Sequence, residues 1–253
     1  MNINANLTAN GRDIRLNLFL GLANWFIFLD HIPNNFVNWI TARNYGFSGA
    51  ADLFIFISGY TTATNLASFP EGDWDFNPFC WQLLFVFGAC VALEGASQFR
   101  ATHQSTIALY FAAVYLAFAL VMTMAGRFPE FGAMFPAWLF DAFNPNDKEN
   151  LAPYRVLHFI VVAFFVTRFV PEDWSGLNRP IFRPLVKCGE QSLAVFCAAV
   201  FLSFAGHFIL TTSSGSVVMQ LLVSATGIAV MTSTAYYISW SKQQDAGKTL
   251  AHA

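Results

Sequence analysis

Long apolar runs separated by short polar stretches recur along the whole chain. Seven of them come close to the length of about 20 residues that a helix needs to cross a bilayer. Inside lipid every backbone N–H and C=O must be paired within its own segment, so each run is expected to be a helix. The expected spans are residues 14–32, 50–67, 79–96, 105–125, 154–171, 189–211 and 216–240. The pattern predicts an all-α polytopic transmembrane helical bundle, with a short amphipathic surface helix within 126–153.

The composition supports a membrane protein. The chain is 56 % hydrophobic and 11 % charged, whereas a soluble domain carries about 25 % charged residues. Its 13 Lys and Arg against 15 Asp and Glu form no basic stripe, so we expect the lipid bilayer and no nucleic acid as a partner. The four cysteines form no CxxC pair and the five histidines are scattered, so no metal site is predicted.

The positive charges do not fit seven consecutive spans. Counted from an inside N-terminus, five Lys and Arg lie inside and eight outside, the reverse of the positive-inside rule. With the last five spans inverted, nine lie inside and four outside. The chain is therefore expected to be one membrane domain, residues 1–253, in which an N-terminal part (14–67) and a C-terminal part (79–240) are joined where an odd number of spans is missing.

Polar residues recur at helical spacing along the first expected span. Asp13, Asn17, Asn24 and His31 fall within about 40° of one another on a helix of 3.6 residues per turn. Leu20 is the one apolar interruption of this stripe. Such a stripe must face protein or water, and its spacing fits both interhelical hydrogen bonds and a functional site.

Asp30 and His31 stand at the end of this span, ahead of Pro33. Imidazole titrates near neutral pH and suits general base catalysis. By position alone, however, a lone histidine at the end of a span more often caps the helix. Asp30 would orient or charge His31, but neighbouring residues point about 100° apart on a helix, so a direct pair is not implied.

Further polar residues lie within or beside the later spans. Asp52, in the first turns of the second span, needs a partner in lipid. Arg43 or His31 is the expected one, and a purely structural ion pair is the alternative. Ser58 shares a helical face with Thr62. The other polar candidates are Asn77, Trp81, Gln82, Arg155 and His158.

Four blocks of sequence resemble the OpgC family of membrane acyltransferases: RDIRLNLFLGLANWFIFLDHIPNNFVNW, ITARNYGFSGAADLFIFISGY, FNPFCWQLLFVFGA and NLAPYRVLHF. The resemblance runs over essentially the whole chain. It implies a multi-pass enzyme of the bacterial inner membrane that passes succinyl from succinyl-CoA, an acyl-CoA donor, to a hydroxyl of a periplasmic glucan, with no bound cofactor. The family histidine maps onto His31, which would act as the base with Asp30 beside it. The resemblance makes substrate-binding candidates of Arg43, Asn44, Asp52, Ser58, Asn77, Trp81, Gln82, Arg155 and His158.

The chain departs from the family pattern at two places. The family places an arginine eleven residues before the histidine, where this chain has Leu20. Family members also carry a central block of helices that is missing here. Two functions therefore stay open: a working acyltransferase, and a catalytically degenerate, truncated paralogue that acts as an accessory membrane protein. A small transporter is a third, but no inverted repeat or pair of broken spans favours it.

Overall fold

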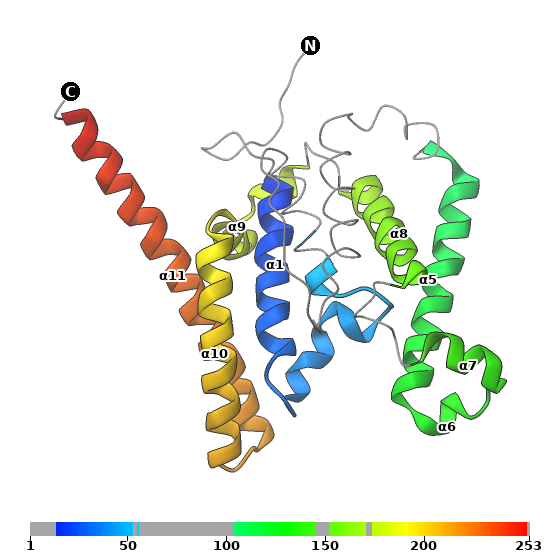
Figure 1. Ribbon diagram of the computed structural model, residues 1–253. Coiled ribbons are helices and arrows are strands. Elements are labelled where there is room, and N and C mark those ends of the chain that lie inside the picture. The colour runs from blue at the N-terminus through cyan, green and yellow to red at the C-terminus, as the bar shows by residue number, and fades with distance from the viewer. Residues whose placement is uncertain (1–13, 53–54, 56–103, 145–151, 171–173, 252–253) are drawn as a thin grey trace, which may run out of the picture. The chain divides into compact units, whose positions relative to one another are not determined.

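The computed structural model describes residues 14–52, 55, 104–144, 152–170 and 174–251, which are helices and connecting turns without a β-strand (Figure 1). The chain divides into two compact units. Unit 1 consists of Met1–Thr41 and Glu172–Ala253, and unit 2 consists of Ala42–Pro171.

Unit 1 is built around α1, which packs closely against α9 and α10, while α11 packs against α9 and α10. The backbones of α1 and α9 approach so closely that a Cβ at Gly21 would meet the carbonyl oxygen of Leu185, and one at Gly189 would meet that of Asn17. Only glycine permits this approach. The helices of unit 1 are α1 (Ile14–Asp30), α9 (Arg183–Glu190), α10 (Ser192–Thr212), α11 (Val217–Ala251) and the 3-10 helices η1 (Phe36–Ile40), η3 (Ser175–Asn178) and η4 (Pro180–Phe182).

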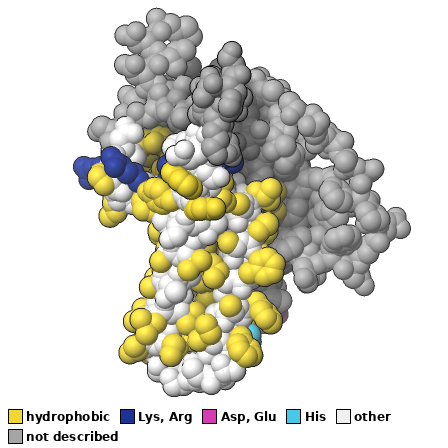
Figure 2. Space-filling view, turned by 90° about the vertical axis from the view of Figure 1, so that its left-hand side faces the viewer, with side chains coloured by type: hydrophobic (Ala, Val, Ile, Leu, Met, Phe, Trp, Pro, Cys, Tyr) yellow, Lys and Arg dark blue, Asp and Glu magenta, His cyan; other side chains and the backbone are white. Residues whose placement is uncertain are grey.

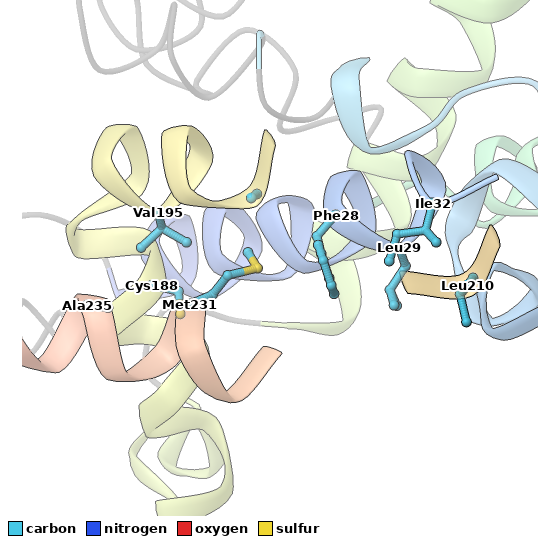
Figure 3. Packing of buried hydrophobic residues seen from close by; sticks show 9 residues of the cluster. Phe28, Leu29, Ile32, Cys188, Val195, Leu210, Met231 and Ala235 are labelled. Atoms are coloured by element: carbon cyan, nitrogen blue, oxygen red, sulfur yellow. The ribbon is translucent and has the colours of Figure 1, made fainter. Parts of the chain in front are cut away.

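The core of unit 1 combines side chains from α1, α9, α10 and α11. Figure 3 shows eight labelled members of this cluster, which are Phe28, Leu29, Ile32, Cys188, Val195, Leu210, Met231 and Ala235. The segment that follows α1 is fixed to α11 by hydrogen bonds. Asn35 Nδ2 donates to Ser224 Oγ at 2.8 Å, and the Phe36 N–H donates to Gln220 Oε1 at 2.7 Å.

Unit 2 packs its aromatic side chains around Phe47. This buried ring is stacked on Phe143 at a centroid distance of 5.3 Å and meets Tyr154 edge to face at 4.9 Å, geometries that aromatic pairs favour. Pro129 and Pro153 occupy first turns of helices, where the missing N–H costs nothing. The helices of unit 2 are η2 (Ala42–Asn44), α5 (Thr106–Arg127), α6 (Pro129–Gly132), α7 (Ala137–Phe143) and α8 (Pro153–Phe169).

Three described helical segments are long and apolar enough to cross a membrane: Thr106–Arg127, Ser192–Thr212 and Val217–Gln244. Phe111, Phe201 and Phe204 on these helices are 74 %, 77 % and 75 % exposed, as side chains that face lipid would be. α1 and α8 have 17 residues each. The expected span 79–96 and most of 50–67 lie outside the described residues, so the number of seven spans stays a prediction.

Two expectations change in detail. The span expected over about 189–211 is present as α10, but it begins at Ser192, because α9 ends at Glu190 and Gln191 separates the two helices. The single surface helix expected within 126–153 is two short helices, α6 and α7, because Pro136 stands between them and the residue before a proline is disfavoured in the helical conformation.

Candidate functional site

His31 lies in the turn directly after α1, and its side chain is exposed. Its Nδ1 is 2.7 Å from the carbonyl oxygen of Ile27. A carbonyl can only accept, so Nδ1 carries the proton and, in the neutral ring, Nε2 carries the free lone pair. The predicted helix cap is therefore confirmed. The same hydrogen bond leaves an exposed nitrogen that can accept a proton.

Asp30, the last residue of α1, is bound to the end of η1. Its Oδ1 accepts from Thr41 Oγ1 at 2.7 Å, and the same hydroxyl lies 2.7 Å from the Asn38 carbonyl oxygen. Thr41 is completely buried. Asp30 therefore ties the end of α1 to the end of η1 and fixes the turn that carries His31.

The polar stripe of α1 faces protein, as its pattern required. Asn17, Leu20 and Asn24 are at most 2 % exposed, while Asp13 lies outside the described residues. Asn24 Nδ2 donates to the Ser192 carbonyl at 3.3 Å, which links α1 to the start of α10. The position where the resemblance expects an arginine is thus a packed apolar contact in unit 1.

Asp52 and Arg155 form a buried ion pair in unit 2. Asp52 Oδ2 is 2.9 Å from Arg155 Nη2, and the two side chains are 1 % and 6 % exposed. The Gly49 N–H also donates to Oδ2, at 2.6 Å. The predicted partners of Asp52, Arg43 and His31, are wrong: the first turn of α8 brings Arg155 to the carboxylate, and Arg43 is exposed.

His158, one turn after Arg155, binds Ser48. Ser48 Oγ lies 2.5 Å and Ser48 N lies 3.3 Å from Nδ1 of the imidazole. Because the backbone N–H can only donate, Nδ1 is an acceptor and the Ser48 hydroxyl also donates to it. Both side chains are buried. Arg155 and His158, three residues apart on α8, thus bind Asp52 and Ser48, which are four residues apart in the preceding segment.

Asn44 is the other predicted binding residue that the structure buries. Its Oδ1 accepts from Arg127 Nη2 at the end of α5. Sequence reasoning missed both Arg127 and Ser48, because each is recognisable only through its partner. The remaining candidates, Ser58, Asn77, Trp81 and Gln82, lie outside the described residues.

The two groups of candidates differ in what they can do. In unit 2, Asp52, Arg155 and His158 are buried and bound to one another or to neighbouring residues, so they hold the segment before Asp52 against α8. In unit 1, His31 presents an exposed acceptor nitrogen. Among the described residues, no group of three His, Cys, Asp or Glu side chains is placed to hold a metal ion.

These helices and their exposed apolar surfaces define an all-α membrane protein. The family model described as OpgC protein matches residues 12–68 and 62–243. The chain belongs to the OpgC family. Comparisons with curated proteins and with solved structures gave no significant match. The two matched segments meet at 62–68, beside the place where a block of helices is predicted to be missing; that deletion stays a prediction.

Proposed function

We propose that the protein is an O-acyltransferase of the bacterial inner membrane that transfers succinyl from succinyl-CoA to a hydroxyl of a periplasmic glucan. Membership of the OpgC family supports the reaction class. The observation that carries the proposal is the hydrogen bond from His31 Nδ1 to the Ile27 carbonyl, which leaves Nε2 exposed as a base.

In this reaction the acceptor hydroxyl gives its proton to His31 Nε2 while its oxygen attacks the thioester carbonyl of the donor. The new C–O bond forms, the C–S bond breaks, and the leaving thiolate takes the proton from the imidazolium. The Ile27 carbonyl stabilises the imidazolium through Nδ1–H. A positioned base of this kind contributes about 10²–10⁴-fold in rate.

A specific observation favours a second function, that of an accessory membrane protein without catalysis. Leu20 is 2 % exposed on the face where the family pattern carries an arginine. A guanidinium there would bind a carboxylate, a phosphate or the developing oxyanion, and a leucine cannot. The two functions differ in whether the chain acylates glucan by itself.

The test is complementation of a bacterium that lacks its glucan succinyltransferase. We expect the unmodified chain to restore succinylated glucan, measured by mass spectrometry, and His31→Gln to lower the rate by about 10²–10⁴-fold at an equal amount of protein in the membrane. The control is His207→Gln, the same substitution in α10 of the same unit, which should retain the rate of the unmodified chain.

The outcomes separate the two functions. Equal activity of the unmodified chain and His31→Gln would rule out His31 as the base. Succinylation by Leu20→Arg but not by the unmodified chain would establish the degenerate, accessory form. If neither the unmodified chain nor Leu20→Arg succinylates glucan, although both are present in the membrane, the acyltransferase proposal is contradicted. The loss of activity would then be assigned to the helices predicted to be missing.

A further inference from the structure

The segment 174–191 lies at the level where two membrane spans end. Gln191, directly before α10, accepts a hydrogen bond from Lys242 Nζ at 2.7 Å and donates one to Ser239 Oγ at 3.3 Å. Lys242 stands near the end of the apolar part of α11, Val217–Gln244. The start of one span is therefore fixed beside the end of another, and the residues just before Gln191 lie at the membrane–water boundary.

One side of this segment is anchored in unit 1. Val186 and Cys188 of α9 are buried, and Cys188 belongs to the core cluster that Figure 3 shows. Gly189 packs against the backbone of α1. With these residues held inside, the orientation of α9 and of the turn before it is set by packing.

The other side exposes an apolar tip between two cations. Ile181, in η4, is 75 % exposed, and Arg179 and Arg183 on either side of it are also exposed. Trp174, at the start of the segment, is 40 % exposed. Basic residues beside exposed apolar and aromatic side chains are the pattern of segments that lie in a bilayer interface.

The positive charge at this end is not neutralised by the described residues. Lys187 is paired with Glu190 at 2.7 Å, and among the described residues Lys242 donates to the neutral Gln191 amide. Arg179 and Arg183 make no side-chain hydrogen bond or ion pair with another residue of the described part of the chain. Figure 2 shows Lys and Arg side chains gathered toward one end of this face, with hydrophobic side chains over much of its remaining described surface.

We propose that Arg179, Arg183 and Lys242 form a docking surface for the phosphate groups of anionic phospholipids, with Ile181 inserted at the headgroup–acyl boundary. Guanidinium groups bind phosphate oxygens in pairs, which suits them to this ligand. A soluble phosphate compound would satisfy the cations but would leave Ile181 and Trp174 in water. The positive-inside count puts this end in the cytoplasm, where the leaflet is anionic. The surface does not depend on the proposed catalysis.

The experiment measures the binding of phosphatidylglycerol and phosphatidylcholine to the purified full chain in mixed micelles by native mass spectrometry. We expect a preference for phosphatidylglycerol that weakens with salt. Arg179→Gln/Arg183→Gln should lower phosphatidylglycerol binding about thirtyfold, or about fivefold for each guanidinium, while Arg179→Lys/Arg183→Lys should retain most of it. The single variant Arg179→Gln should lower binding about fivefold. Its charge-matched control is Arg43→Gln, which removes one exposed guanidinium from unit 2 and should leave lipid binding unchanged.

Ile181→Ser tests the apolar contact separately, and should weaken phosphatidylglycerol binding without changing its dependence on salt. Equal binding of both lipids, or an unchanged preference in the double glutamine variant, would overturn the proposal. So would displacement of phosphatidylglycerol by coenzyme A, which would identify a site for soluble phosphates. If the double variant does not fold, the salt titration of the unmodified chain decides, because a preference that is insensitive to salt would also overturn the proposal.

Discussion

The two units bury polar groups in different ways. In unit 2 the buried polar residues include an ion pair, Asp52–Arg155, and a hydrogen-bonded His158. In unit 1 the described buried polar side chains are neutral amides and hydroxyls, while His31 is exposed at the end of α1. The buried titratable groups Asp52, Arg155 and His158 of unit 2 are thus bound to one another or to their neighbours, whereas His31 of unit 1 is exposed.

Polar side chains that stabilise the fold are therefore distinct from those that are accessible for a reaction. A buried ion pair adds little net stability, because desolvation offsets its attraction, but removing one partner is costly. A unit held by close backbone contact, such as that of α1 with α9 at Gly21, is instead sensitive to added volume. Each unit should therefore respond to a kind of substitution that the other tolerates.

The largest expected effect is the loss of one partner of the ion pair in unit 2. Asp52→Ala leaves Arg155 buried and uncompensated, and should lower the free energy of unfolding by about 3–5 kcal/mol, measured by denaturant titration in detergent micelles. The double variant Asp52→Leu/Arg155→Met is the control and should recover most of the loss. If the double variant is as unstable as the single one, the uncompensated charge is not the cause.

A smaller effect is expected from added volume in unit 1. A Cβ at Gly21 would meet the Leu185 carbonyl oxygen, so Gly21→Ala must separate α1 from α9 and should cost about 1–3 kcal/mol. The matched control is Gly49→Ala in unit 2, whose Cβ would lie at an ordinary 3.7 Å from Arg43 Cβ. The same unfolding titration compares the two, and equal losses would contradict the special role of backbone contact in unit 1.

Sequence periodicity predicted the buried face of α1 correctly. Asn17, Leu20 and Asn24 share a face by spacing alone, and all are buried. The spacing could not extend to His31, because the helix ends at Asp30 and the angle per residue changes in the turn. The cap by His31 was predictable from its position, but the free Nε2 follows only from the hydrogen bond to Ile27.

Partners distant in sequence could not be predicted in the same way. Asp52 was expected to bind Arg43 or His31, but its partner is Arg155, 103 residues away in the chain. In the sequence, Arg43, Arg155 and His31 could each supply the positive charge that a buried carboxylate needs. Arg155 is the partner because α8 packs beside Asp52. The hydrogen bonds of Gln191, between α9 and α10, are likewise made to residues about 50 positions away, Ser239 and Lys242 on α11.

The smallest expected effect is on a neutral contact of unit 1, the hydrogen bond from Asn35 Nδ2 to Ser224 Oγ. Asn35 Oδ1 also accepts from the Val37 N–H, so Asn35→Ala removes more than this contact. A double-mutant cycle with Ser224→Ala isolates the pair. We expect a coupling of about 0.5–1.5 kcal/mol, several times smaller than the loss in Asp52→Ala.

The cycle is measured by the same unfolding titration. Because Asn35 lies four residues after His31, the two single variants also test whether the hydrogen bond to α11 positions the turn that carries His31. If it does, each variant should lower the rate of succinylation at an equal amount of folded protein. A coupling near zero would show that the segment after α1 is held by other contacts, such as that of Phe36 with Gln220. If the coupling energy is as large as the stability lost in Asp52→Ala, neutral and charged buried pairs do not differ in energy. The comparison of the two units would then fail.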